Sequence, residues 1–199
     1  MATSVRNKVS TSTTSGTYRV THAPIKPEVL VRDYNVGTRA FEWAARAYDS
    51  SNNIKNISLS RNEDLEVGVT AEGMITDGIS YIWVKANRGD SEILYNVDLP
   101  GNANVNNEEY LRVIDKINSA LGITDTSEPY VSEQDHTRTK DDIVQELKKI
   151  SDITVDANDG VSRYEDTYTP DERGVYYCVV INELNNNLAV NVSPFFIVS

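Results

Sequence analysis

The most reactive side chain type in the chain is a thiol, and Cys178 is the only cysteine among the 199 residues. A lone cysteine becomes a nucleophile or metal ligand where a neighbouring base or cation stabilises its thiolate. Cys178 lies instead within TPDERGVYYCVVIN, from Thr169 to Asn182, among Val, Tyr and Ile. A thiol in such surroundings packs as a small hydrophobic side chain. We therefore expect Cys178 to be buried and inert, with no partner for an internal disulfide.

The other residues that could bind a metal or transfer protons are scattered. His22 and His136 occur in polar, loop-like stretches with no second His or Cys near either, which favours exposed polar residues over metal ligands. The run DANDG starts at Asp156, but its glycine falls one position too early for an EF-hand loop. Glu108 and Glu109 suit the first turn of a helix better than acid–base chemistry. The sequence thus predicts no catalytic residues, no metal and no cofactor.

Charge is divided unevenly along the chain. The formal net charge is −11, whereas residues 1–27 contain four basic residues and no acidic one, so the remaining 172 residues carry −15 (−11 minus +4). An acidic body argues against nucleic-acid binding, which needs Lys and Arg on phosphates. No apolar run approaches the roughly 20 residues of a membrane span, and no signal-peptide stretch is present. We expect protein partners, with candidate interaction residues Arg6, Lys8, Arg19, Lys26, Phe41 and Trp43.

The first 56 residues lack a clear core pattern. Residues 1–17 include nine Ser or Thr, and residues 1–30 are predicted to form a flexible or extended basic N-terminal arm. Residues 31–56 are predicted to form a connecting or anchoring segment between the arm and the rest of the chain. Within them Phe41 and Trp43 alternate as in a strand, whereas Phe41, Ala44 and Tyr48 fit a helix face that Thr38 could cap. We favour the helix, with a strand as the open alternative.

From residue 57 onward the sequence alternates as β-strands do. The segments LEVGVTAEG, ISYIWVKAN and EILYNVDLP read as short antiparallel strands separated by turn residues. After residue 150 the same pattern returns in residues 151–170, in GVYYCVVIN and in LAVNVSPFFIV. Residues 57–100 and 151–199 are therefore predicted to build one β domain.

Residues 101–150 are predicted to form two inserted helices. In NNEEYLRVIDKINSALG the residues Tyr110, Ile114, Ile117 and Leu121 share one face, and Gly122 can end the helix. In TKDDIVQELKKI a capping box of Thr139 and Asp142 precedes the apolar face of Ile143, Leu147 and Ile150.

Residues Glu172 to Cys178, ERGVYYC, resemble the Asp-x-Gly-x-Tyr-x-Cys signature of strand F in immunoglobulin-like domains. The resemblance implies that Tyr176 forms a tyrosine corner and that Trp83, in SYIWVK, is the buried tryptophan of strand C. Strand B is then LEVGVTAEG, with Val67 or Val69 at the place of the family's first cysteine. Glu172 replaces the usual Asp, and the inter-sheet disulfide is missing. The structural core residues implied are Trp83, Val69, Tyr176 and Cys178.

The fold class expected is thus mainly β, an immunoglobulin-like antiparallel sandwich with a two-helix insertion and an extended N-terminal arm. Together with the Ser/Thr-rich arm and acidic, Asn-rich body, it is similar to virion proteins of tailed bacteriophages. This resemblance implies a non-enzymatic structural protein, such as a capsid decoration, neck or tail component, in the virion and assembled in the host cytoplasm. Its partners would be other virion proteins and further copies of itself, with no nucleic acid and no membrane. The alternative is a recognition module, an adhesin or glycan-binding domain.

Overall fold

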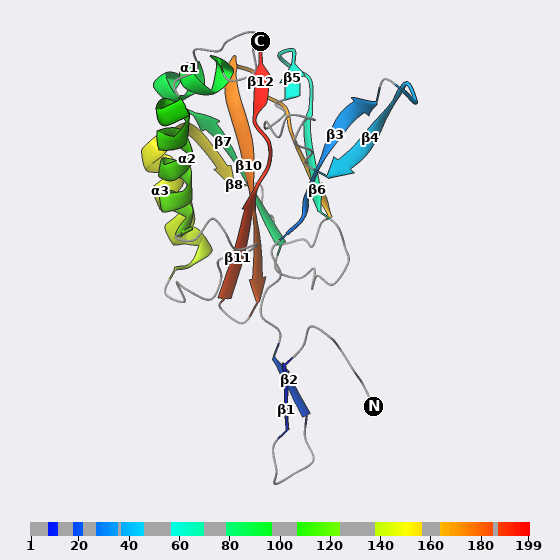
Figure 1. Cartoon of the computed structure of the whole chain (residues 1–199), viewed down its shortest axis with the longest axis vertical. Helices are drawn as coiled ribbons and strands as arrows, with labels where there is room; N and C mark the ends of the chain where they lie inside the picture. The colour runs from blue at the N-terminus through cyan, green and yellow to red at the C-terminus, as the bar shows by residue number, and fades with distance from the viewer. Residues whose placement is uncertain are drawn as a thin grey trace.

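The computed structural model describes residues 8–11, 18–21, 27–35, 37–45, 57–69, 79–96, 107–123, 138–156, 164–184 and 187–199. The body of the chain is mainly β and has three layers, with a layer of helices, a central sheet and a second sheet (Figure 1). The antiparallel sandwich predicted from the sequence is confirmed by the two facing sheets.

The central sheet is built around one long strand, β10. On one side β10 pairs with β7, and on the other it pairs with β12 along its first half and β11 along its second. Beyond these, β5 runs parallel to β12, and β8 runs antiparallel to β7. The strands are β5 (Ile57–Leu59), β7 (Ile79–Ala86), β8 (Ser151–Asp156), β10 (Gly174–Leu184), β11 (Asn187–Val192) and β12 (Phe196–Val198).

The second sheet is antiparallel throughout and follows the order β4-β3-β6-β9. Its strands are β3 (Val29–Asn35), β4 (Ala40–Ala45), β6 (Leu65–Val69) and β9 (Glu165–Tyr168). The helix favoured for residues around Phe41 is therefore wrong. Arg39 adopts φ 55° in the turn before β4, and pairing with β3 then outweighs the helix preference of the alanines. Residues 31–56 thus contribute two strands to the sandwich.

The N-terminal arm contains a hairpin of its own. Strands β1 (Lys8–Thr11) and β2 (Tyr18–Thr21) pair antiparallel, with Lys8 opposite Thr21 and Ser10 opposite Arg19. Among the described strands they pair only with each other (Figure 1). The body begins earlier than predicted, because Pro27 is buried and its carbonyl accepts a 2.7 Å hydrogen bond from the side-chain amide of Asn191.

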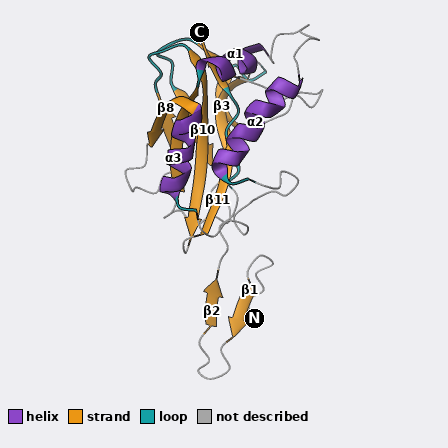
Figure 2. Ribbon diagram, turned by 90° about the vertical axis from the view of Figure 1, so that its left-hand side faces the viewer, coloured by secondary structure: helices purple, strands orange, loops and turns teal. Residues whose placement is uncertain are grey.

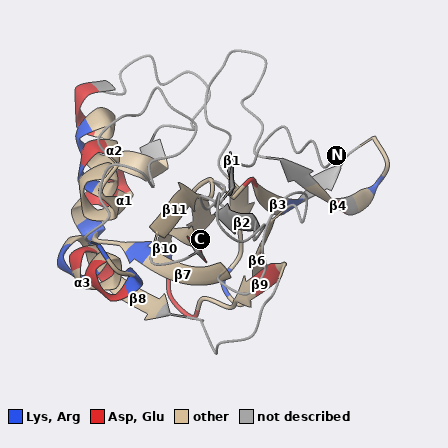
Figure 3. Cartoon of the chain, turned by 90° about the horizontal axis from the view of Figure 1, so that it is seen from below, with Lys and Arg blue, Asp and Glu red and all other residues tan. Residues whose placement is uncertain are grey.

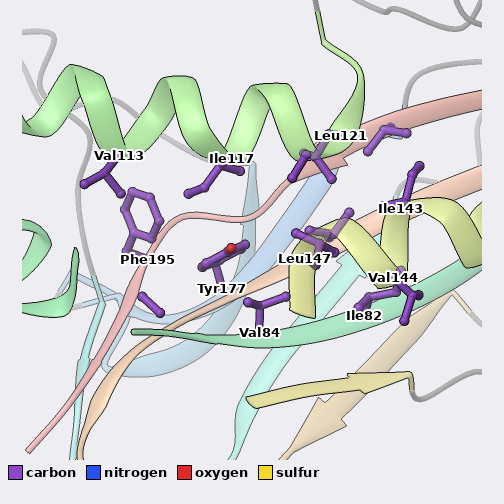
Figure 4. Close-up of a cluster of buried hydrophobic side chains, with 14 of the residues drawn as sticks. Ile82, Val84, Val113, Ile117, Leu121, Ile143, Val144, Leu147, Tyr177 and Phe195 are labelled. Carbon is purple, nitrogen blue, oxygen red and sulfur yellow. The ribbon is translucent and has the colours of Figure 1, made fainter. Parts of the chain in front are cut away.

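Alternate residues of β7 and β10 point into two different cores, as the period of a strand requires. The sandwich core, between the two sheets, receives Tyr81, Trp83, Tyr176, Cys178 and Val180. The helix-side core, between the central sheet and the helices, receives Ile82, Val84, Val175, Tyr177, Val179 and Ile181 (Figure 4). Both faces of β10 are therefore buried, which explains its almost continuous apolar sequence.

Within the described residues three helices cover the helix-side core, whereas two inserted helices were predicted (Figure 2). They are α1 (Arg88–Asn96), α2 (Asn107–Leu121) and α3 (Lys140–Ile150). The strand predicted from Glu92 is wrong, because the turn residue Asn87 instead caps α1. Its side-chain oxygen accepts a 3.0 Å hydrogen bond from the amide of Asp90. The capping box of α3 is confirmed, and so is the end of α2 at Gly122, which has a φ of 73°.

Candidate functional site

The four residues proposed for the structural core lie together between the two sheets. Trp83, Val69, Tyr176 and Cys178 have exposed fractions of 1%, 5%, 1% and 0%. Trp83 and Cys178 are directly opposite each other on β7 and β10. These residues lie in a packed interior, so their role is structural and a substrate could not reach them.

One hydrogen bond crosses this core from the central sheet to the second sheet. The indole nitrogen of Trp83 donates to Oδ2 of Asp166 over 2.7 Å, and Asp166 is only 7% exposed. The ring of Tyr168, also on β9, stacks on Trp83 with ring centroids 5.8 Å apart. Sequence reasoning missed Asp166, because only the pairing of β9 with β6 brings it under Trp83.

A second polar cluster lies at the start of β10. The hydroxyl of Tyr176 donates a 2.9 Å hydrogen bond to the carbonyl of Glu172, the contact that a tyrosine corner makes. Burial raises the pKa of Tyr176, so its hydroxyl keeps the proton that it donates. The Glu172 carboxylate pairs with the ammonium of Lys85, and this hydrogen bond lowers the pKa of Glu172. Lys85 reaches the cluster from β7 with its stem buried.

The environment of Cys178 is that of a structural residue. Complete burial, reinforced by the negative charge of Asp166, raises the pKa of the thiol well above its ordinary value. Its backbone amide donates a 2.8 Å hydrogen bond to the hydroxyl of Ser193. Pro194 follows, and the register between β10 and the last two strands shifts there by one residue. A thiolate is disfavoured at this position, so nucleophilic chemistry is too.

A candidate interaction surface lies on the outer face of the second sheet. We call it the outer aromatic surface and define it by Arg32, Trp43, Tyr164, Glu66 and Gly68. Trp43 is 38% exposed and Tyr164 48%. A Cβ atom placed on Gly68 would lie 3.2 Å from the Trp43 ring and 3.3 Å from the Tyr164 carbonyl, so the glycine lets the indole lie close to the sheet. Arg32, opposite Trp43 on β3, is 3.3 Å from Glu66.

The structure places two of the other predicted interaction residues outside the strands that form this surface. Lys8 and Arg19 are in the β1–β2 hairpin, and Phe41 is in β4, paired with Tyr34. Arg6 and Lys26 lie outside the described residues. Sequence reasoning identified Trp43 but missed its neighbours. A glycine inside a strand often marks a close approach, and Gly68 was that signal.

The sequence also offers Tyr130, Tyr168 and Tyr177 as exposed candidates for a recognition surface, and the structure places two of them. Tyr177 is 1% exposed within the helix-side core, so its proposed exposure is wrong. Tyr168 is half-buried against Trp83. Tyr130 lies outside the described residues.

The part of the chain that the structure describes has neither a metal-binding cluster nor a helix suited to cross a bilayer. No group of three or more His, Cys, Asp or Glu is suited there to hold a metal ion. His22 and His136 are outside the described ranges. Among the described helices, none combines the length and apolar character needed to cross a bilayer. Acidic and basic side chains are interspersed on α2 and α3 (Figure 3).

Comparison of the chain with protein-family models, with curated proteins and with solved structures finds no match.

Proposed function

We propose that the chain is a non-enzymatic structural component of a virus particle of the tailed-phage type, such as a head decoration, head–tail, neck or tail protein, anchored through its N-terminal region. The observation that carries the proposal is the division of the chain. Residues 1–27 are basic without an acid, and their described hairpin forms a separate sheet. The body that follows is acidic and has a layered core. A basic arm on an acidic body suits repeated contacts between protein subunits.

An immunoglobulin-like origin of the sandwich belongs to this proposal. The Tyr176 hydroxyl bond to Glu172 and the burial of Trp83 support it. So does strand order, since β7, β10 and β11–β12 would be strands C, F and G, and β3, β6 and β9 would be A, B and E. The helices α1–α3 then form an insertion after strand C that covers the outer face of its sheet.

The partners on this proposal are other virion proteins and further copies of the chain, in a virion assembled in the host cytoplasm. The acidic body gives little attraction to nucleic-acid phosphates. Association would instead depend on the arm, whose basic residues are Arg6, Lys8, Arg19 and Lys26.

The test is incorporation of an arm-deleted protein into particles. Residues 1–26 are removed and Pro27 is kept, because the Pro27 carbonyl accepts a hydrogen bond from the Asn191 side chain and β3 begins at Val29. We expect a folded protein by circular dichroism that is missing from purified particles by mass spectrometry. Normal incorporation would contradict anchoring by the arm, and absence of the full-length chain from particles would contradict the virion proposal itself.

A charge-matched pair of variants refines this test. Lys8→Gln with Arg19→Gln removes two positive charges from the hairpin, whereas Lys148→Gln with Lys149→Gln removes two from the exposed side of α3. We expect only the hairpin variant to reduce incorporation. Equal losses would indicate dependence on net charge alone.

The outer aromatic surface favours a second candidate function, recognition of a glycan. An exposed tryptophan lying near the sheet offers a flat apolar face, and Arg32 and Glu66 offer hydrogen-bonding groups beside it. Recognition would be supported by binding on a glycan array that is lost in Trp43→Ala. The control is Tyr95→Ala, which removes an exposed aromatic side chain from α1 and should keep the binding. An array without specific binding would remove this candidate.

A further inference from the structure

We propose that the β1–β2 hairpin of one chain adds, in a second copy, to the edge of β4 that pairs with no described strand, extending the β4-β3-β6-β9 sheet. The inference rests on the proposed function in that it takes the arm to be an anchor, and it names what the anchor binds. The recognition mode is strand addition, in which backbone hydrogen bonds hold the added strand and side chains select the partner.

The hairpin needs further contacts to be stable. Strands β1 and β2 have four residues each and pair only with each other among the described strands. A lone two-stranded hairpin is at best marginally stable in water, and a third strand or a packing surface is required. The hairpin is not paired with β4 of its own chain, although both are described. A second copy offers the same edge.

The edge of β4 is the least protected among the described strands. Its sequence, AFEWAA, contains neither Lys nor Pro, the residues that usually block edge pairing. The edge strand β5 has three residues, and β9 has four and is soon followed by Pro170. Of the remaining edge strands, β8 carries two acidic residues, Asp152 and Asp156, against the single Glu42 of β4, and β11 contacts Pro27 through Asn191. With six residues, β4 is long enough to pair a whole hairpin strand.

Charge complementarity selects the occupant. The arm has Arg6, Lys8, Arg19 and Lys26 and no acid. The sheet that would receive it exposes Glu42 on β4 and Glu165 on β9, while Glu66 on β6 is already paired with Arg32. The exposed indole of Trp43 can take a basic side chain over its face. Attraction between these charges steers the arm of one copy to this sheet of another.

The test is chemical cross-linking between two full-length variants. One carries Val9→Cys or Val20→Cys, which are opposite each other in the hairpin, and the other carries Ala40→Cys at the exposed start of β4. Because Cys178 is fully buried, it does not compete with the introduced thiols for the reagent. A short bis-maleimide should give a heterodimer that decreases as salt rises, since screening weakens the charge attraction. The matched control, Asp152→Cys on the edge strand β8, should give none.

Three outcomes overturn the inference. The first is no heterodimer from either hairpin position, and the second is equal cross-linking to Asp152→Cys. The third comes from a chain carrying both Val20→Cys and Ala40→Cys, in which an internally linked monomer at high dilution would assign the hairpin to its own chain. If the protein is found in particles while these experiments fail, the virion proposal stands and the edge of β4 is not its anchor site. If cross-linking succeeds for a protein that is missing from particles, the pairing of the hairpin with β4 stands and the virion proposal is wrong.

Discussion

Trp83 on β7 and Asp166 on β9 are joined by a 2.7 Å hydrogen bond that links the two sheets of the sandwich. In immunoglobulin domains of antibodies a disulfide makes the link between sheets. Here Cys178 is unpaired, and a polar contact close to it supplies a connection of another kind. The contribution of this hydrogen bond to stability can be measured by substituting its two residues, because both side chains are buried.

Removing the carboxylate should destabilise the fold. In Asp166→Leu the buried Trp83 nitrogen loses its acceptor, and Asp166→Asn should cost less because it keeps an amide oxygen. A double-mutant cycle of Asp166→Leu and Trp83→Phe, followed by urea unfolding, should give a coupling energy of about 1.5–3 kcal/mol, as for hydrogen bonds to charged groups. A coupling near zero would show that the bond does not stabilise the sandwich.

The Lys85–Glu172 pair should make stability depend on acid pH. The pKa of Glu172 is lowered in the folded protein, so its contribution is present above the ordinary pKa of the unfolded chain and is lost as pH falls through the lowered value. Glu172→Gln should therefore unfold at lower urea than the parent at neutral pH, and the gap should close in acid. Glu92→Gln, which breaks the exposed pair with Arg88, is the control and should change little. A gap that persists unchanged in acid would contradict this assignment.

Cys178 should resist thiol reagents in the native protein. It is fully buried and its pKa is raised, so both access and thiolate formation are disfavoured. Labelling by Ellman's reagent should be slow in buffer and immediate in denaturant, whereas Ala40→Cys should add one thiol that reacts at once. Rapid labelling of the parent protein would indicate an accessible and activated cysteine.

Two glycine substitutions should have opposite effects. In Gly68→Ala the new methyl would approach the Trp43 ring and the Tyr164 carbonyl at 3.2 and 3.3 Å, so the indole must move away from the sheet. We expect lower stability and more quenching of Trp43 fluorescence by acrylamide. In Gly89→Ala the nearest atom is 3.6 Å away, and the helix position should gain about 0.4–1 kcal/mol. Both changes are read by urea unfolding, and unaltered quenching in Gly68→Ala would show that the glycine does not seat the ring.

The sequence was sufficient where local pattern and tertiary packing agree. The strands around Trp83 and Cys178 and the helices α2 and α3 follow from apolar periodicity and caps. The prediction was wrong where one residue type suits two structures. Asn87 is predicted to form a turn before a strand, but it caps the helix α1. Around Phe41, alanines favour a helix until β3 pairs with them.

The candidate site was less predictable than the fold. Trp83 and Asp166 are 83 positions apart, and their contact exists only because β9 pairs with β6 in one register. The neighbours of Trp43 on the outer aromatic surface are brought together in the same way, by β3 and β6. Such contacts are set by sheet order, which composition and periodicity do not specify.

The burial of β10 on both faces has a consequence for how the protein is made. This strand belongs to both cores, yet it follows β3, β6, β7 and all three helices in the chain. During synthesis those elements emerge first, each with an apolar face that packs in a core to which β10 has yet to contribute. Neither core is complete before the last strands are synthesised, because β10, β11 and β12 all supply residues to them, so the nascent body exposes apolar surface until then.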